Sequence, residues 1–407
     1  MDKDFLVDDE DCGALLLRPL GHGTPDGVAR VDVAKAMRDG LRARRARAWS
    51  TAVAVTAGVA VVVTGGLLVL RPQNQALPPV LPADPSVPAS CTASALPAGD
   101  AKSAEVNAGD PSGRYLVGAS EPVEGGDHNV LVWRDGKLVA DVAYQGPRVS
   151  MTDINASGVA VGATTGGVTL PYAYESGRVT RMKGAGNAVA INDAGIVAGD
   201  TEPVIKDPQP QRWASWDAEP ELMPMPAGMT AGQAFDITED GTILTSLWSR
   251  NVGGIYLWHA DGTVEKVEPP KAAPGHEVFA GPLAFHFGWL YAEVRTPSLN
   301  SSESTPEART VGSNYRYDPA SRTWQDLGTK SYSVQVPAVQ RRGGGFLQNK
   351  PTVYVGKKVL TLPPLAKYDD DAFKVAFISA DARVVAGSNL SGVAAERPVL
   401  PIIWRCR

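Results

Sequence analysis

The sequence predicts an all-β fold, a seven-bladed β-propeller at residues 91–407 carried on a single N-terminal transmembrane helix. Three observations support this fold class: an uncharged apolar run near the N-terminus, a proline-rich segment directly after it, and a short-strand motif that recurs along the rest of the chain. The net charge of −5 and the apolar fraction of 43% are those of a folded protein, not of a disordered one. We therefore divide the chain into a cytoplasmic tail (1–48), a transmembrane helix (49–70), a linker (71–90) and an extracytoplasmic propeller (91–407).

The apolar run Trp49–Leu70 has 22 residues without a charge. As a helix with a rise of about 1.5 Å per residue it would extend about 33 Å, which is enough for a hydrocarbon core of about 30 Å. A cleaved signal peptide would begin close to the N-terminus and end in small residues, whereas this run follows a long tail and ends in leucines and valine. We therefore expect an uncleaved membrane anchor.

The basic residues beside this run predict its orientation. Between the run and Ser90 the only one is Arg71, whereas six precede it closely: Lys35, Arg38, Arg42, Arg44, Arg45 and Arg47. This asymmetry follows the positive-inside rule, so we expect a single-pass plasma-membrane protein with its N-terminus in the cytoplasm and residues 91–407 outside. The outer part has no basic stripe, which argues against a nucleic-acid partner.

The segment Arg71–Ser90 contains six prolines in 20 residues. Proline fixes φ and removes a backbone donor, so this composition predicts an extended, semi-rigid spacer between membrane and propeller.

Residues 91–407 contain internal repeats. Asp153–Gly162 matches Ala190–Gly199 closely, and weaker copies occur at Ala108–Gly118, Asp236–Thr245 and Ile378–Gly387. Each copy predicts a short strand, a turn and a second short strand. A second recurring piece follows each copy: a strand that ends in an aromatic residue, a Gly or Asp turn and a further strand, as in Val130–Val139, Tyr172–Val179 and Ile255–Val264.

The second piece occurs about seven times, which gives units of about 45 residues, the period of a four-stranded propeller blade. Seven blades are therefore expected, and six or eight are also compatible with the period. The fifth and sixth units, around Gly288 and Gly345, lack the Asn-Asp-Ala-Gly turn and are the weakest copies.

The turn Ile191-Asn192-Asp193-Ala194-Gly195 with Gly199, together with the aromatic-Asp-Gly hairpin, resembles the extracellular HAF repeat and related propeller repeats of actinobacterial surface proteins. The resemblance covers units two to four well and the others loosely. It implies a propeller fold and a cell-surface location. It implies no activity, because that repeat class has no common catalytic residues.

The two ends of the repeat region carry cysteines. The last unit supplies Pro401–Cys406 as a third strand but has no fourth, and Cys91–Pro97 resembles the fourth strand of an earlier unit. We therefore predict that the N-terminal segment completes the last blade and that Cys91 and Cys406 form a disulfide between neighbouring strands, favoured by the oxidising side of the membrane.

The sequence indicates no catalytic, cofactor-binding or metal-binding residues. The histidines of the outer domain fall at unlike positions in their units: His128, His259, His276 and His286. Lys367–Asp371 could help to coordinate a hard cation, but a solvated loop is the simpler interpretation. Gly184–Gly186 is read as a turn between blades rather than a nucleotide site, and the recurring tryptophans as core. In the tail, Cys12 and His22 are too few for a zinc module.

Loop lengths suggest where a partner would bind. The turns between first and second strands are tight, whereas the second-to-third and inter-blade connections, which share the opposite face, are long. We expect a non-catalytic binding module for a protein or glycan at the cell surface. Two alternatives stay open: an envelope glycosidase or lyase with its site in the central channel, and a transmembrane signalling protein.

Overall fold

The computed structural model describes residues 84–120, 128–144, 147–165, 167–201, 207–250, 252–271, 278–295, 313–330, 351–366, 372–390 and 398–407, which all belong to one compact unit, Ala76–Arg407. The predicted tail, the predicted transmembrane helix and most of the predicted linker lie outside these residues. Within the described part of the chain, no helix is long and apolar enough to cross a membrane.

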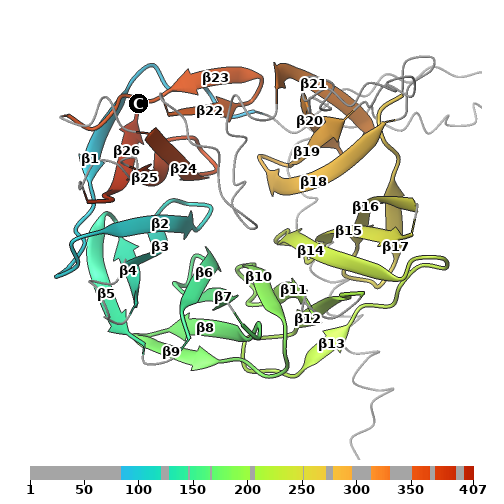
Figure 1. The fold of residues 1–407 in the computed structure, drawn as a ribbon. Coiled ribbons are helices and arrows are strands. Elements are labelled where there is room, and N and C mark those ends of the chain that lie inside the picture. Colours follow the sequence, from blue (N-terminus) through green and yellow to red (C-terminus); the bar gives the residue numbers. More distant parts are fainter. Residues whose placement is uncertain are drawn as a thin grey trace, which may run out of the picture. The chain divides into compact units, whose positions relative to one another are not determined.

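The described strands form antiparallel sheets around a common axis, as expected for a β-propeller (Figure 1). In five sheets, four consecutive strands pair in sequence order. The first two blades contain β2 (Ala104–Gly109), β3 (Tyr115–Ser120), β4 (Asn129–Arg134) and β5 (Lys137–Ala143), then β6 (Val149–Ile154), β7 (Ala160–Thr164), β8 (Pro171–Glu175) and β9 (Arg178–Arg181). The third and fourth contain β10 (Asn187–Ile191), β11 (Val197–Asp200), β12 (Pro210–Trp213) and β13 (Pro220–Leu222), then β14 (Ala231–Ile237), β15 (Ile243–Ser249), β16 (Val252–Trp258) and β17 (Val264–Val267). The fifth contains β18 (Phe279–His286), β19 (Trp289–Arg295), β20 (Ser313–Asp318) and β21 (Thr323–Lys330).

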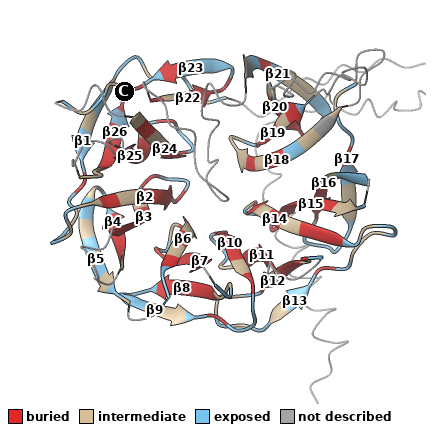
Figure 2. Cartoon of the chain, viewed as in Figure 1, coloured by how far each residue is buried: buried red, intermediate tan, exposed pale blue. Residues whose placement is uncertain are grey.

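Burial follows position in the blade (Figure 2). The middle strands β3 and β4 are almost entirely buried, whereas the outermost strand β5 alternates between exposed and half-buried residues. The core therefore lies between neighbouring blades, which pack face to face.

The innermost strand of every four-stranded blade carries a β-bulge at the same place. In β6 the bulge lies between Met151 and Asp153, and in β14 between Ala234 and Asp236. The inner strands β2, β10, β18 and β24 (Ala372–Ile378) have it at the equivalent position. A bulge bends the strand and re-aims the side chains that follow it, so all inner strands deliver their last residues to the axis in the same way.

The last glycine of the repeat motif lies on the second strand, opposite the inner strand just before this bulge. A Cβ atom on Gly162 would lie 2.0 Å from the carbonyl oxygen of Ser150, and one on Gly199 would lie 1.9 Å from that of Asn187. Gly118 and Gly387 are equally close to an inner-strand carbonyl. In these four copies the position is glycine because the two backbones approach too closely for a side chain, whereas the copy in the fourth blade has Thr245 there.

The recurring tryptophans are core residues, as predicted: Trp133, Trp213, Trp258 and Trp404 are at most 2% exposed. Three of them also donate the indole N–H to a carbonyl of the segment that leads into their blade: Trp133 to Pro97 (2.7 Å), Trp213 to Lys183 (3.0 Å) and Trp404 to Pro363 (2.7 Å). One side chain thus fills the core and holds the inter-blade connection.

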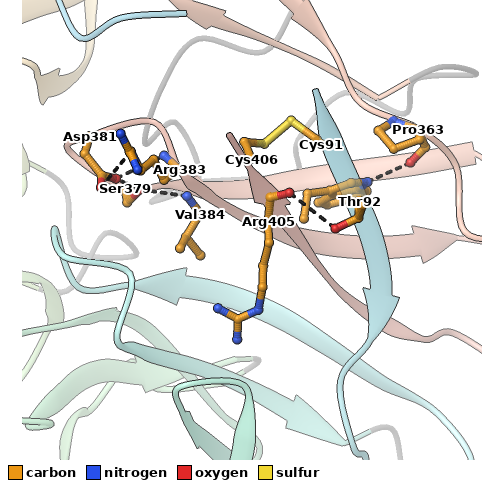
Figure 3. Close-up of a disulfide and its surroundings, with 10 residues drawn as sticks. Cys91, Thr92, Pro363, Ser379, Asp381, Arg383, Val384, Arg405 and Cys406 are labelled. Carbon is orange, nitrogen blue, oxygen red and sulfur yellow. Dashed lines mark hydrogen bonds and ion pairs between the residues drawn. A yellow bond between two sulfur atoms is a disulfide. The ribbon is translucent and has the colours of Figure 1, made fainter. Parts of the chain in front are cut away.

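The ring is closed by strands from both ends of the domain, as predicted. The last blade has the order β1 (Cys91–Ala95), β26 (Pro401–Cys406), β25 (Val384–Leu390) and β24, so the N-terminal strand supplies its outermost member. Cys91 is paired directly with Cys406 in the β1–β26 register, and the two form a disulfide (Figure 3).

The number of blades differs from the prediction. Among the described residues six sheets are four-stranded, whereas β22 (Thr352–Val355) and β23 (Lys358–Thr361) form a sheet of two strands. This hairpin packs between its neighbours: Tyr354 belongs to the same hydrophobic cluster as Trp289 of the fifth blade, and Val353 belongs to the core of the last blade. The predicted seven blades are therefore corrected to six. The difference arises at the sixth unit, around Gly345, where the described residues form the β22–β23 hairpin alone.

The end of the predicted linker is held on the propeller. The Ala89 N–H donates to the carbonyl oxygen of Arg407 at 2.6 Å, and the Arg407 N–H donates to that of Ser90 at 2.9 Å. Further upstream, the Asp84 carboxylate forms an ion pair with Arg316 of β20. Residues 84–90 thus continue the closure that β1 begins.

Candidate functional site: a pocket at the ends of the inner strands

The inner strands end together at the face of the tight first-to-second-strand turns, and a pocket of about 90 Å³ lies among these ends. All six blades contribute to it. Its apolar wall includes Ile154, Ile191, Ile237, Phe285 and Phe377, and its polar lining is Asp153, Asp236, Glu239 and His286. The long loops expected to carry function belong to the opposite face, and most of their residues lie outside the described ranges.

Two aspartates of this pocket connect neighbouring blades. Asp153 and Asp236 occupy the same position after the bulge, and they are 5% and 2% exposed. An oxygen of Asp153 accepts the N–H of Ile191 in the next blade at 2.8 Å, and one of Asp236 accepts the N–H of Phe285 at 2.8 Å. Because a buried carboxylate must be hydrogen-bonded, these bonds stabilise both the charge and the blade contact.

The asparagine of the repeat turn makes a second contact between blades. The Asn155 side chain donates to the carbonyl oxygen of Asn192 at 3.1 Å, and the Asn192 side chain donates to that of Thr238 at 3.2 Å. Within its own turn, each asparagine accepts a backbone N–H four residues later, from Val159 and Ile196 respectively. The motif is therefore an inter-blade connection, which explains why it repeats.

Glu239 lies at the pocket mouth, in the β14–β15 turn. One of its oxygens accepts the N–H of Asp193 at 2.9 Å. Partial burial raises the pKa of the Glu239 carboxyl above its usual value, and the negative charges of Asp193 and Asp236 act in the same direction. The pKa of the next residue, Asp240, is shifted in the opposite direction. The Thr238 hydroxyl donates a hydrogen bond to the Asp240 carboxylate and lowers its pKa.

His286 is the last residue of β18 and the only histidine among the described pocket residues. The two-residue turn that follows, Phe287-Gly288, has φ values of 52° and 79° and replaces the longer turn of the other units. The His286 ring contacts that of Phe287, with centroids 4.0 Å apart. The short turn therefore brings an imidazole to the pocket at the place where other blades have a polar turn residue.

The remaining histidines are elsewhere. His128 lies 3.1 Å from the carbonyl oxygen of Ser120, and Nε2 of His259 lies 3.4 Å from a carboxylate oxygen of Glu265 within the fourth blade. In the part of the chain that the structure describes, no three His, Cys, Asp or Glu side chains come close enough together to hold a metal ion. His276 and Lys367–Asp371 lie outside the described residues.

Of the residues selected from the sequence, Cys91 and Cys406 are brought together, in a structural disulfide. Gly184 and Gly186 lie between β9 and β10 with φ values of 83° and 108°, so they form an inter-blade turn as predicted. The sequence did not indicate that Glu239 and His286 share a pocket. The two aspartates could have been selected from the sequence, because each lies two residues before the residue that begins the turn in its copy of the repeat motif.

No protein-family model and no curated protein matches the chain. Solved structures with a similar fold include the β-propeller domain of the Trilobed protease from Pyrococcus furiosus, at 13% identity over 57% of this chain and 69% of that one, with a TM-score of 0.39. A putative TolB from Agrobacterium tumefaciens has 14% identity over 64% of this chain and 91% of its own, with a TM-score of 0.38. Virginiamycin B lyase from Staphylococcus aureus has 11% identity over 78% of this chain and 99% of its own, with a TM-score of 0.43. At these identities the likeness concerns the propeller fold alone.

Proposed function

We propose that the protein is a membrane-anchored, extracytoplasmic binding module whose central pocket receives one positively charged group of a partner protein or glycan, without catalysis. The observation that carries this proposal is the convergence of three carboxylate side chains on a pocket of about 90 Å³ at the axis. Carboxylates held at such a site favour a guanidinium or ammonium group, such as an arginine or lysine side chain or an amino sugar.

The volume supports a single group rather than a whole substrate. Pockets that enclose a small-molecule ligand usually measure about 300–1,000 Å³. A volume of about 90 Å³ is well below this range, so the pocket suits the end of a side chain. The aspartates also fit such a role, because their inter-blade hydrogen bonds keep them in place without the partner.

The location is part of the proposal. The uncharged run Trp49–Leu70 and the basic residues before it support a single crossing with the propeller outside. The Cys91–Cys406 disulfide supports an oxidising compartment. The likeness of units two to four to HAF-type repeats points to the same location.

Titration of the full-length protein in nanodiscs with N-acetyl-argininamide, followed by NMR, tests the binding proposal. We expect saturable shifts of amides around the pocket, and weaker binding by fivefold or more in Glu239→Gln, because the amide keeps an acceptor for the Asp193 N–H but loses the charge. The matched control is Glu175→Gln, on an exposed residue at the end of β8, which should bind like the wild type. Equal binding of N-acetyl-glutamic acid amide, or unchanged binding by Glu239→Gln, would overturn the proposal.

The alternative of an enzyme has one observation in its favour, the presence of His286 and Glu239 in the same pocket. A histidine and a carboxyl with a raised pKa could act as general base and acid. The enzyme would be favoured if the wild type turned over envelope polysaccharide and both His286→Gln and Glu239→Gln lost this activity. Binding without turnover would favour the module.

A further inference from the structure

A buried arginine that is not among the residues lining the central pocket lies where the fifth blade meets the β22–β23 hairpin. The Arg316 side chain on β20 is only 2% exposed. Its guanidinium carbon lies 4.0 Å from the centroid of the Trp289 ring, and its Nε donates to Gln325 at 3.0 Å. The stacking and the Nε bond orient the guanidinium so that its two terminal nitrogens point toward one partner.

That partner comes from the segment before the propeller. Nη1 and Nη2 of Arg316 donate to Oδ1 and Oδ2 of Asp84 at 2.5 and 2.9 Å, which is the parallel, two-pronged geometry of an arginine–carboxylate pair. Gly356, in the β22–β23 turn, forms another wall: a Cβ atom there would lie 2.7 Å from Oδ2 of Asp84. The carboxylate thus lies between β20 and the β22–β23 turn, two elements that are distant from Asp84 in the sequence.

The two charges differ in exposure. The Asp84 side chain is 32% exposed, whereas the arginine beneath it is almost completely covered. The site is therefore open to solvent only on the side where the carboxylate lies. Among the described residues Asp84 is the acidic side chain that pairs with this guanidinium. A buried guanidinium that lost this partner would gain strongly from binding another carboxylate.

We propose that Arg316, Trp289 and the β22–β23 turn form a carboxylate-binding site, which the chain fills with its own Asp84. The segment 84–90 then acts as a strap with a built-in ligand: while Asp84 is bound the strap holds the hairpin against the fifth blade, and a strap that is released exposes a receptor for carboxylates. This inference does not depend on the function proposed for the central pocket.

Chemical rescue tests the site in the full-length protein. We expect Asp84→Ala to lower the Tm by about 5 °C. Acetate, added at constant ionic strength against chloride, should restore at least half of this loss in a saturable manner. The wild type, in which Asp84 occupies the site, should show no acetate effect. The matched control Asp100→Ala removes an exposed aspartate in the turn after β1 and should melt like the wild type with or without acetate.

A second variant separates the charge from the packing. Asp84→Asn keeps the shape of the side chain but fills the site with a neutral amide, so it should melt below the wild type and respond to acetate less than Asp84→Ala does. A wild-type Tm for Asp84→Ala, or an acetate effect of equal size in the wild type, Asp84→Ala and Asp100→Ala, would show that no carboxylate site exists.

Discussion

Cys91 and Cys406 face each other across the β1–β26 pair with their Cα atoms 4.0 Å apart, although 315 residues separate them in the sequence. The bond joins the first strand of the propeller domain to the last, so it closes almost the whole ring in one loop. A blade completed from both ends of the chain leaves no unpaired strand where the ring begins.

The first prediction concerns this disulfide. Cys91→Ser should lower the free energy of unfolding by up to about 5 kcal/mol, since the bond restricts a very long loop in the unfolded chain. Cys406→Ser and the double variant should lose the same amount, because either change breaks the same bond. Denaturant unfolding measures the loss, and Cys12→Ser is the control. Losses that add in the double variant would contradict the interpretation.

The second prediction concerns the motif glycine. Gly162→Ala should destabilise the propeller by about 3 kcal/mol, because the new Cβ would lie 2.0 Å from the Ser150 carbonyl oxygen and the backbones must separate. Gly281→Ala is a matched control in β18, where nothing lies within 4 Å of the added atom. The control should stay within about 0.5 kcal/mol of the wild type. Similar unfolding curves for both variants would mean that the close approach does not determine the residue.

The third prediction concerns the asparagine that connects blades. Asn192→Asp keeps the oxygen that accepts the Ile196 N–H but removes the donor to the Thr238 carbonyl and introduces a buried charge. We expect a loss of about 2 kcal/mol at neutral pH. Hydrogen exchange should become faster in the β14–β15 turn, which contains the acceptor, and not only in the mutated turn. An effect confined to the third blade would show that the bond does not couple blades.

The fourth prediction concerns pH. The pKa of the Glu239 carboxyl is raised in the folded protein, so its ionisation opposes folding. The contribution of Glu239 to stability therefore falls as the pH rises from the usual glutamate pKa through the folded pKa. The pKa of Asp240 is lowered, so its contribution is present above the usual aspartate value and is lost as the pH falls through the folded pKa. On acidification Glu239 should therefore take up its proton well before Asp240, by more than the ordinary difference between Glu and Asp.

NMR titration of the two carboxyl carbons measures this order. Thr238→Val removes the hydroxyl that donates to Asp240, so the Asp240 midpoint should rise toward its usual value while that of Glu239 stays in place. A joint shift of both midpoints would indicate that the turn had rearranged, and the assignment of the cause would be wrong.

The propeller could be predicted because its units repeat. The match between Asp153–Gly162 and Ala190–Gly199 reflects one local structure, a bulged inner strand, a tight turn and a second strand held close by glycine. The closure could also be predicted, since the last unit lacks one strand and the first segment offers one. The number of blades could not be predicted correctly because the repeat motif is not recognisable around Gly345. The average length of the repeat units was the only evidence for a blade in that region.

The pocket could not be predicted for a different reason. Asp153, Asp236, Glu239 and His286 belong to three blades and share no sequence spacing. Asp153 and Asp236 belong to the repeat motif. Their bonds between blades explain why they recur there, so the recurrence gave no indication that both lie at the axis. His286 reaches the pocket from the fifth blade, whose short turn departs from the motif.

The sequence alone determined the elements that depend on neighbouring residues: short strands, their turns and the tryptophan positions. It also determined the pairing of the two terminal strands, because the last unit lacks a fourth strand and the first segment resembles one. The tertiary structure decided what depends on the arrangement of the ring, namely six four-stranded blades, the carboxylates at the axis and the contact between Asp84 and Arg316, which are 232 residues apart. The physical reason is that strand and turn formation is governed by local backbone and side-chain preferences, which leave a repeating pattern. A contact between single residues of distant segments is produced only by packing, and it leaves no pattern along the chain.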